Sequence, residues 1–153
     1  KRNIKRELIP DAKHESILVG RVINYLMWDG KKSTAERVVY DMLDQLKKNL
    51  PEVDPVTTLE NAIKNISPQV ELRPRRVGGA TYQVPREVNT ERKLALAIRW
   101  LLAATRAKKG KPMADRLADE LLLALKNEGA AIKKKQDTHR MAEANRAFAH
   151  FAW

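Results

Sequence analysis

The sequence predicts a mainly α-helical protein, a single-domain bundle of about six helices from which a two-stranded β-hairpin projects. Three observations lead to this prediction. Apolar residues recur at helical spacing in six segments of the chain. Between the third and fourth segments, the pattern changes to two β-prone stretches that flank Gly78-Gly79. The length of 153 residues and the hydrophobic fraction of 43% suit one compact core, so residues 1–153 are expected to form one domain.

Capping and turn residues place the first helices. Residues 1–13 are polar and predict an extended basic arm. A helical stripe runs from about Glu15 to Trp28, where Asp29-Gly30 ends it in a turn. The segment Ser33-Thr34-Ala35-Glu36 matches a capping box, so the next helix is expected to begin there and to close before Pro51.

The later helices follow from similar signals. Asp54-Pro55 is typical of an N-cap followed by proline at the first helical position. After the hairpin, a cap at Asn89 or Thr90 opens a helix, and the helix after that is expected to end at Gly129. The last segment, from Ala131 to about His150, is helical by composition, although its apolar stripe is thin.

The hairpin arm is expected over residues 70–88. Its strands, Val70 to Val77 and Thr81 to Val88, are joined by Gly78-Gly79, which supplies the backbone freedom of a two-residue turn. Each strand contains a proline, which cannot donate a ladder hydrogen bond, so the ribbon is two-stranded or lies at a sheet edge. Such a ribbon is marginally stable alone in water, so we expect it to be braced by what it binds.

Three arginines precede the tip of this hairpin. A two-residue turn places Arg75 opposite Tyr82 and Arg73 opposite Val84. The planar guanidinium group can bind phosphate through two hydrogen bonds and can stack on bases. A charged strand edge also resists aggregation, but lysine or glutamate would serve that purpose equally well. Arg73, Arg75 and Arg76 therefore favour RNA contact.

The charge of the chain is large and unevenly distributed. The formal net charge is +11, and the isoelectric point is about 10.0. Residues 73–111 hold eleven Lys and Arg against two Asp and Glu, a net charge of +9, whereas residues 34–60 carry a net charge of −3. A balance this basic indicates a polyanionic partner, with nucleic acid as the first interpretation and an anionic membrane surface as the second.

Other classes of function have little support. The chain has no cysteine, no apolar run long enough to span a bilayer and no apolar segment behind its basic N-terminus. We therefore expect a cytoplasmic protein without a membrane partner. The three histidines are scattered, and the sequence has no recognisable nucleophile–base pair, Walker loop or acidic cluster. Hence we expect no enzyme, cofactor, metal site or small-molecule substrate.

Further basic segments extend the predicted interface. The N-terminal arm is either a disordered tail or a segment that orders on RNA, and we favour the second. The loops at Lys31-Lys32 and Lys108–Lys111 are either solvated charge or phosphate contacts, and neither interpretation is preferred for a single loop. The predicted RNA-binding residues are Lys1, Arg2, Lys5, Arg6, Lys31, Lys32, Arg73, Arg75, Arg76, Arg92, Lys93, Arg99, Arg106, Lys108, Lys109 and Lys111.

Aromatic residues make up only 5% of the chain. Trp100 adjoins an apolar helical face, so we expect it to pack against the core. Recognition of RNA is therefore expected to depend on backbone and shape more than on base stacking.

Three segments, Trp28–Lys32, Arg73–Pro85 and Lys133–His150, closely resemble the ribosomal protein seven family of the bacterial small subunit, and the likeness runs nearly end to end. The resemblance implies a structural constituent of the small ribosomal subunit. It implies a primary binder of the 3′ major domain of 16S ribosomal RNA that nucleates assembly of the head. It also implies a place near the exit-site tRNA and the mRNA exit path, beside ribosomal proteins nine and eleven of the same subunit.

The same resemblance implies roles for individual residues. Lys31, Lys32, Arg75, Arg76 and the basic arm correspond to RNA contacts. The hairpin tip corresponds to the part near exit-site tRNA, and its residues are Val77, Gly78, Gly79, Ala80, Thr81 and Tyr82.

The chain departs from the family pattern at two positions. Arg86 stands where an apolar residue is usual, and we expect it to pair across the ribbon with Glu71. Ala152 stands where arginine is usual, which puts contacts at that terminus in question. The family also serves bacterial-type ribosomes inside organelles, and some members repress translation of their own messenger. Messenger binding and nonspecific compaction of DNA remain open as alternative functions.

Overall fold

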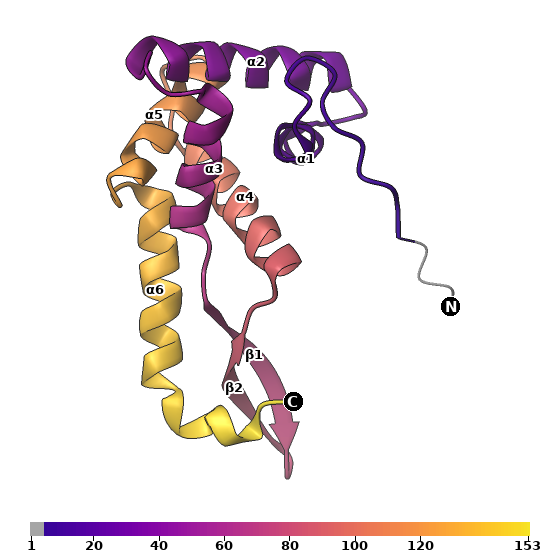
Figure 1. The fold of residues 1–153 in the computed structure, drawn as a ribbon. Coiled ribbons are helices and arrows are strands. Elements are labelled where there is room, and N and C mark those ends of the chain that lie inside the picture. The colour runs from indigo at the N-terminus through magenta and orange to yellow at the C-terminus, as the bar shows by residue number, and fades with distance from the viewer. Residues whose placement is uncertain (1–4) are drawn as a thin grey trace.

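The computed structural model describes residues 5–153 and confirms a mainly α-helical fold with one two-stranded hairpin (Figure 1). In this part of the chain the elements are, in order, α1 (Ile17–Leu26), α2 (Lys32–Asn49), α3 (Pro55–Ile66), β1 (Val70–Val77), β2 (Ala80–Glu87), α4 (Thr90–Ala107), α5 (Met113–Leu125), α6 (Ala130–Ala144) and the 3-10 helix η1 (Arg146–Phe151). Figure 1 shows α2 lying across one end of the molecule and the hairpin at the other. Between these ends α6 runs along one side, and η1 then crosses to the hairpin.

The predicted apolar stripes pack into one hydrophobic core among the helices. Residues three or four apart face inward on each helix, as with Leu43 and Leu46 on α2 and Leu117 and Leu121 on α5, all at most 1% exposed. Burying one side chain of this size stabilises the fold by roughly 1.5–3 kcal/mol. Trp100 packs half-buried against the same core, which confirms its predicted place.

Two of the predicted helix caps are confirmed and one is wrong. Asp54 Oδ1 accepts a hydrogen bond from the Val56 N–H at 3.1 Å, and Asn89 Oδ1 accepts one from the Arg92 N–H at 2.9 Å. The capping box at Ser33 does not form, because α2 already begins at Lys32. The turn at Asp29 and Gly30, with φ angles of 52° and 70°, brings the chain into the helix before Ser33 can act as its cap.

The register of the hairpin is as predicted. Arg75 lies opposite Tyr82 and Arg73 opposite Val84. The turn has positive φ angles at Gly78 and Gly79, 58° and 83°, which glycine adopts without steric cost and which suit the twist of a tight hairpin. Strand β2 begins at Ala80, one residue earlier than expected.

The C-terminal segment supports the hairpin in a way that the sequence pattern did not predict. The expected helix to about His150 ends at Ala144, and the chain continues as η1. The ring of Tyr82 on β2 lies 5.1 Å from the ring centres of both Phe148 and Phe151. On the neighbouring strand, Nη1 of Arg75 donates a hydrogen bond to the Phe151 carbonyl. The hairpin is therefore braced from within the chain.

Glu71 connects the hairpin to α4. Its Oε1 accepts a hydrogen bond from Nε of Arg73 at 2.9 Å, and its Oε2 lies 3.3 Å from Nη2 of Arg92. The predicted ion pair between Glu71 and Arg86 is wrong, because the carboxylate, 13% exposed, is already held by these two arginines. Although Arg86 is the register partner of Glu71, its guanidinium lies 5.8 Å from the ring centre of Trp153.

Glu120 ties α5 to the start of α6. Its side chain is fully buried, Oε1 accepts a hydrogen bond from the Ala131 N–H at 3.0 Å, and Oε2 lies 2.7 Å from Nζ of Lys108. Gly129 has a φ angle of 95°, and a Cβ there would approach Glu120 Oε1 to 2.7 Å, so this position requires glycine. The carboxylate thus joins three elements at one buried point.

We expect Glu120→Ala to lower the free energy of unfolding by about 1–3 kcal/mol, because it leaves the buried Ala131 N–H without an acceptor. Urea denaturation of the free protein measures this. Glu120→Gln keeps an oxygen at the same place and is expected to lose less. Equal losses in the two variants would contradict the role given to the Ala131 hydrogen bond.

We expect the double variant Phe148→Ala, Phe151→Ala to speed hydrogen exchange in residues 70–87 while exchange in α3 and α5 stays unchanged. The aromatic contact with Tyr82 is lost, and the two-stranded ribbon then opens locally. Hydrogen exchange followed by mass spectrometry measures both regions. Arg146→Ala is the matched control, since this residue lies on η1 and is exposed; a hairpin that exchanges alike in all three proteins would refute the bracing.

Candidate nucleic-acid interface

Three arginines of α4 form a row along one side of the helix. Arg92, Arg99 and Arg106 are seven residues apart, close to two helical turns, so they leave the helix in nearly the same direction over about 21 Å. Arg99 lies 5.9 Å from the ring centre of Tyr25, and Arg106 lies 4.7 Å from that of Trp28. Because Arg92 contacts the hairpin through Glu71, this arginine row joins the α1–α2 loop to the hairpin.

Two further cations border the arginine row. Nζ of Lys93 donates a hydrogen bond to Oε1 of Gln69 at 2.9 Å. Arg21 of α1 lines a shallow groove together with Arg92, although the sequence pattern did not predict it. An isolated arginine within a helical stripe gives no signal of its own, because only the packing of α1 beside α4 brings it to this surface.

The three hairpin arginines have different surroundings. Strand alternation directs Arg73 and Arg75 to one face and Arg76 to the other. Arg73 is paired with Glu71, and Arg75 is held by the Phe151 carbonyl and lies 5.1 Å from the ring centre of Trp153. Arg76 is exposed, so of the three it is the most accessible to a phosphate group.

The hairpin tip consists of an exposed turn and a supported base. Gly78, Gly79, Ala80 and Thr81 are exposed, whereas Val77 is half-buried. The other half-buried residue of the predicted set is Tyr82, which packs on η1 as described above. The open part of the tip is therefore small and largely backbone, a shape that can enter a narrow space.

The basic loop between α4 and α5 is partly paired with acids of α5. Lys108 contacts the buried Glu120, and Nζ of Lys111 lies 3.0 Å from Oδ2 of Asp119. The hydrogen bond to Asp119 raises the pKa of Lys111. Within residues 5–153, Lys109 has no acidic partner within ion-pair distance and is exposed.

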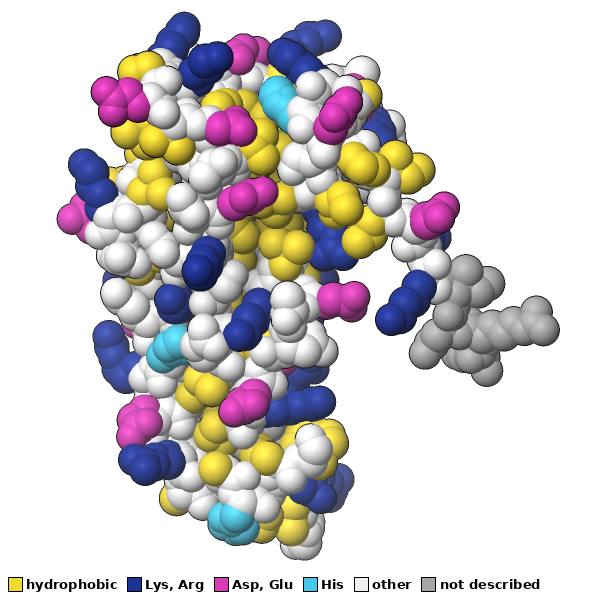
Figure 2. Space-filling view, viewed as in Figure 1, with side chains coloured by type: hydrophobic (Ala, Val, Ile, Leu, Met, Phe, Trp, Pro, Cys, Tyr) yellow, Lys and Arg dark blue, Asp and Glu magenta, His cyan; other side chains and the backbone are white. Residues whose placement is uncertain are grey.

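The cations of the arm and of the α1–α2 loop are in open positions. Lys1 and Arg2 lie outside the described residues. Lys5 and Arg6 are exposed, as are both residues of Lys31-Lys32. Figure 2 shows Lys and Arg side chains along the hairpin end of the molecule on the face that it draws.

Asp11 anchors the end of the arm to α2. Its Oδ1 accepts a hydrogen bond from the Tyr40 hydroxyl at 2.6 Å, and its Oδ2 accepts from the backbone N–H groups of Lys13 and His14. Burial acts to raise the pKa of Asp11, but these hydrogen bonds together outweigh it and lower the pKa. The same bond to Asp11 raises the pKa of Tyr40 to about 12. The arm therefore leaves the helical body from a fixed point.

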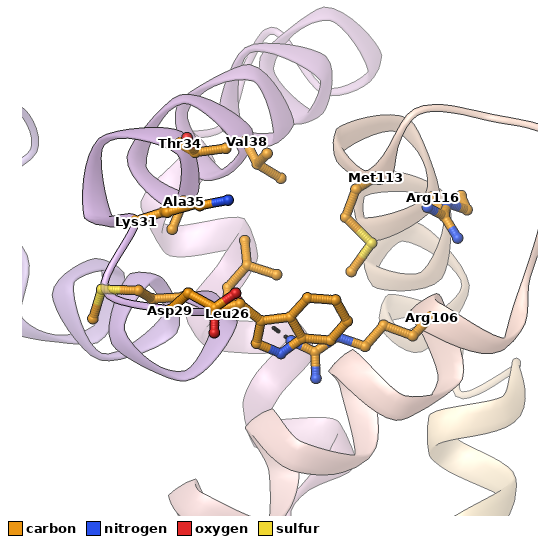
Figure 3. A pocket seen from close by; sticks show the side chains of 11 residues that line it. Leu26, Asp29, Lys31, Thr34, Ala35, Val38, Arg106, Met113 and Arg116 are labelled. Carbon is orange, nitrogen blue, oxygen red and sulfur yellow. Dashed lines mark hydrogen bonds between the residues drawn. The ribbon is translucent and has the colours of Figure 1, made fainter.

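Trp28 is an exposed aromatic residue whose exposure the sequence pattern did not predict. It is 66% exposed and lies close in the chain to Lys31 and Lys32. It lines the pocket drawn in Figure 3, between the α1–α2 loop, α4 and α5. The available signal for this exposure was its position directly before the Asp29-Gly30 turn, since turn residues lie at the surface.

Among residues 5–153, no group of three or more potential metal ligands is present. In the same part of the chain no helix is both long and apolar enough to cross a membrane.

Comparison with known proteins shows which family the chain belongs to. Residues 1–146 match the family model described as ribosomal protein S7p/S5e. The chain is 53% identical over 149 residues to the small ribosomal subunit protein uS7 of Thermotoga neapolitana, covering 97% of this chain and 96% of that one. The protein of the same name from Rhodopirellula baltica is 56% identical over 150 residues, covering 97% and 96% of the two chains. The chain therefore belongs to the ribosomal protein S7p/S5e family.

Proposed function

We propose that the chain is a structural constituent of the small ribosomal subunit, in the cytoplasm, and that it binds ribosomal RNA. The arginine row carries this proposal, because it holds guanidinium groups in line on a rigid helix between two further basic elements. Family membership supports the same role, and it confirms the expectation that the chain is not an enzyme, since the family is a structural component of the ribosome.

The RNA partner that we propose is the 3′ major domain of 16S ribosomal RNA, with the chain as a primary binder that nucleates the head. Proteins recognise an RNA duplex mainly by its shape, through contacts with its phosphates and 2′-hydroxyls. Cations in fixed positions on helices suit this mode of recognition. The exposed cations Lys5, Arg6, Lys31, Lys32, Arg76, Arg99, Arg106, Lys109 and Lys111 would make the phosphate contacts. The half-buried Arg73, Arg75, Arg92, Lys93 and Lys108 would add contacts while holding the elements in place.

The hairpin tip is proposed to lie near the exit-site tRNA and the mRNA exit path, with ribosomal proteins nine and eleven of the subunit as neighbours. Support comes from the shape of the molecule: the tip is exposed at the end opposite α2, and η1 packs against the ribbon (Figure 1). A braced ribbon can extend from an RNA-bound body toward a second ligand without folding on contact.

Filter binding to a transcript of the 3′ major domain tests the proposal. We expect tighter binding to this transcript than to an unrelated RNA of equal length at moderate salt. Equal affinity for the two RNAs would contradict a specific ribosomal role. Competition by duplex DNA at equal concentration would instead indicate nonspecific binding to polyanions.

For the arginines we expect the double variant Arg76→Ala, Arg99→Ala to reduce the slope of log K against log salt concentration by about two units. Each lost phosphate contact removes about 0.9 of slope on a duplex. The matched control is Lys47→Ala, Lys48→Ala, which removes two exposed cations from the last turn of α2. Equal changes of slope in the two double variants would show that only the total charge matters.

A further inference from the structure

The hairpin leaves the helical body through two short connections. Residues 67–69 join α3 to β1, and Val88 and Asn89 join β2 to α4. The Val88 N–H donates a hydrogen bond to the Gln69 carbonyl at 3.1 Å, which ties the two connections together. Because Gln69 directly precedes β1, the direction of the ribbon depends on how this residue is held.

Two other helices hold Gln69. From α4, Nζ of Lys93 donates a hydrogen bond to its side-chain oxygen at 2.9 Å. From α6, Nε2 of His139 accepts a hydrogen bond from its backbone N–H at 3.0 Å. Figure 1 shows α6 passing beside the point where α3 gives way to β1. In this connection the Ser67 N–H is bonded to α3 and Pro68 has no N–H, so the Gln69 N–H is the backbone donor that can reach α6.

The bond between Gln69 and His139 requires a neutral imidazole. Only an unprotonated ring nitrogen can accept, whereas both nitrogens of an imidazolium are donors. Protonation at Nε2 would therefore place two N–H donors against each other. His139 is half-buried; burial lowers its pKa below the ordinary 6.5, and the charge of Lys135 lowers this pKa further. The hydrogen bond from Gln69 acts in the same direction, because it stabilises the neutral form.

The charges around His139 do not offset this preference. Lys135 lies one helical turn before it and is fixed there, since its Nζ donates a hydrogen bond to the Asn65 carbonyl at 2.8 Å. Lys93 adds a second cation from α4 at the same connection. In the described chain no carboxylate lies within ion-pair distance of His139. The carboxylates of α6 and β1 nearest to it in the chain are paired with other side chains, as Asp137–Arg140, Glu143–Arg146 and Glu71 with Arg73 and Arg92.

We propose that His139 is a positioning residue for the hairpin, which holds the base of the ribbon in one direction only while its imidazole is neutral. The bond is present above pH 6.5 and is lost as the pH falls through the lowered pKa of the folded chain. Each strand has 8 residues and extends about 26 Å, so a rotation of about 10° at the base moves the tip by about 4–5 Å. This role belongs to the free chain and does not depend on the RNA partner proposed above.

Nuclear magnetic resonance of the full chain tests whether the two groups are coupled. We expect the Gln69 amide resonance to shift with the same midpoint as the His139 ring, and this midpoint to lie below 6.5. In His139→Ala the Gln69 amide should exchange with solvent roughly 2- to 12-fold faster, the usual equilibrium effect of one neutral hydrogen bond. A Gln69 amide that ignores the titration of the ring, or a ring midpoint at or above 6.5, would overturn the proposal.

A distance measurement tests the direction of the ribbon. The chain has no cysteine, so Lys47→Cys on α2 and Thr81→Cys at the hairpin tip, both exposed, give two unique sites for spin labels. We expect a narrow distance distribution above pH 6.5 that broadens below the midpoint of the ring. His139→Ala should be broad throughout. His139→Gln should be narrow throughout, because its amide oxygen can accept the same hydrogen bond and does not titrate.

His150→Gln is the matched control, since it makes the same change at an exposed histidine of η1. It should keep the pH response of the unmodified chain. A pH response that survives in His139→Gln would assign the effect to other titrating groups, and a response lost in His150→Gln would assign it to η1; either result overturns the role given to His139. A narrow distribution in His139→Ala at every pH would do the same.

Discussion

The hairpin consists of two strands without a third beside them in the described chain, and a ribbon of this kind is marginally stable in water. The C-terminal segment of the same chain stabilises the ribbon by packing against it. Helix α6 carries the chain along the molecule, and η1 returns it so that Phe148 and Phe151 pack on Tyr82. The carbonyl of Phe151 also holds Arg75. As a result the ribbon is braced by contacts within the chain, and Arg76 on the opposite face is left exposed.

The positive charge of the chain serves two purposes. Arg92 and Lys108 pair with carboxylates that are 13% and 0% exposed, so they fix how the hairpin and the last helices meet the body. Exposed pairs such as that of Lys111 contribute little to stability. Arg76, Arg99 and the cations of the α1–α2 loop remain exposed to solvent. The internal pairs thus set the positions from which these open cations would meet the proposed RNA.

Local sequence patterns predicted the helices and the hairpin turn, because these elements are determined by residues that are close together in the chain. The apolar stripes gave the helices, and the two glycines of the turn gave the register of Arg75 and Tyr82. Features that depend on packing were not predictable in this way. The change from α6 to η1 follows from contacts with a strand more than sixty residues away. Trp28 stays 66% exposed even though Arg106 of α4 lies over its ring. The predicted pairing of Arg86 with Glu71 was wrong for the same reason. The strand register does not show that Arg92 of α4 pairs with the Glu71 carboxylate.

We propose that RNA binds the side of the molecule that runs from the α1–α2 loop along α4 to the hairpin. Lysine reactivity toward an amine-specific label, measured by mass spectrometry with and without the 3′ major domain transcript, tests it most directly. We expect Lys31, Lys32 and Lys93 to lose reactivity in the complex, whereas the exposed Lys47, Lys48 and Lys126 keep theirs. Equal protection of the two groups, or protection of the second group alone, would contradict it.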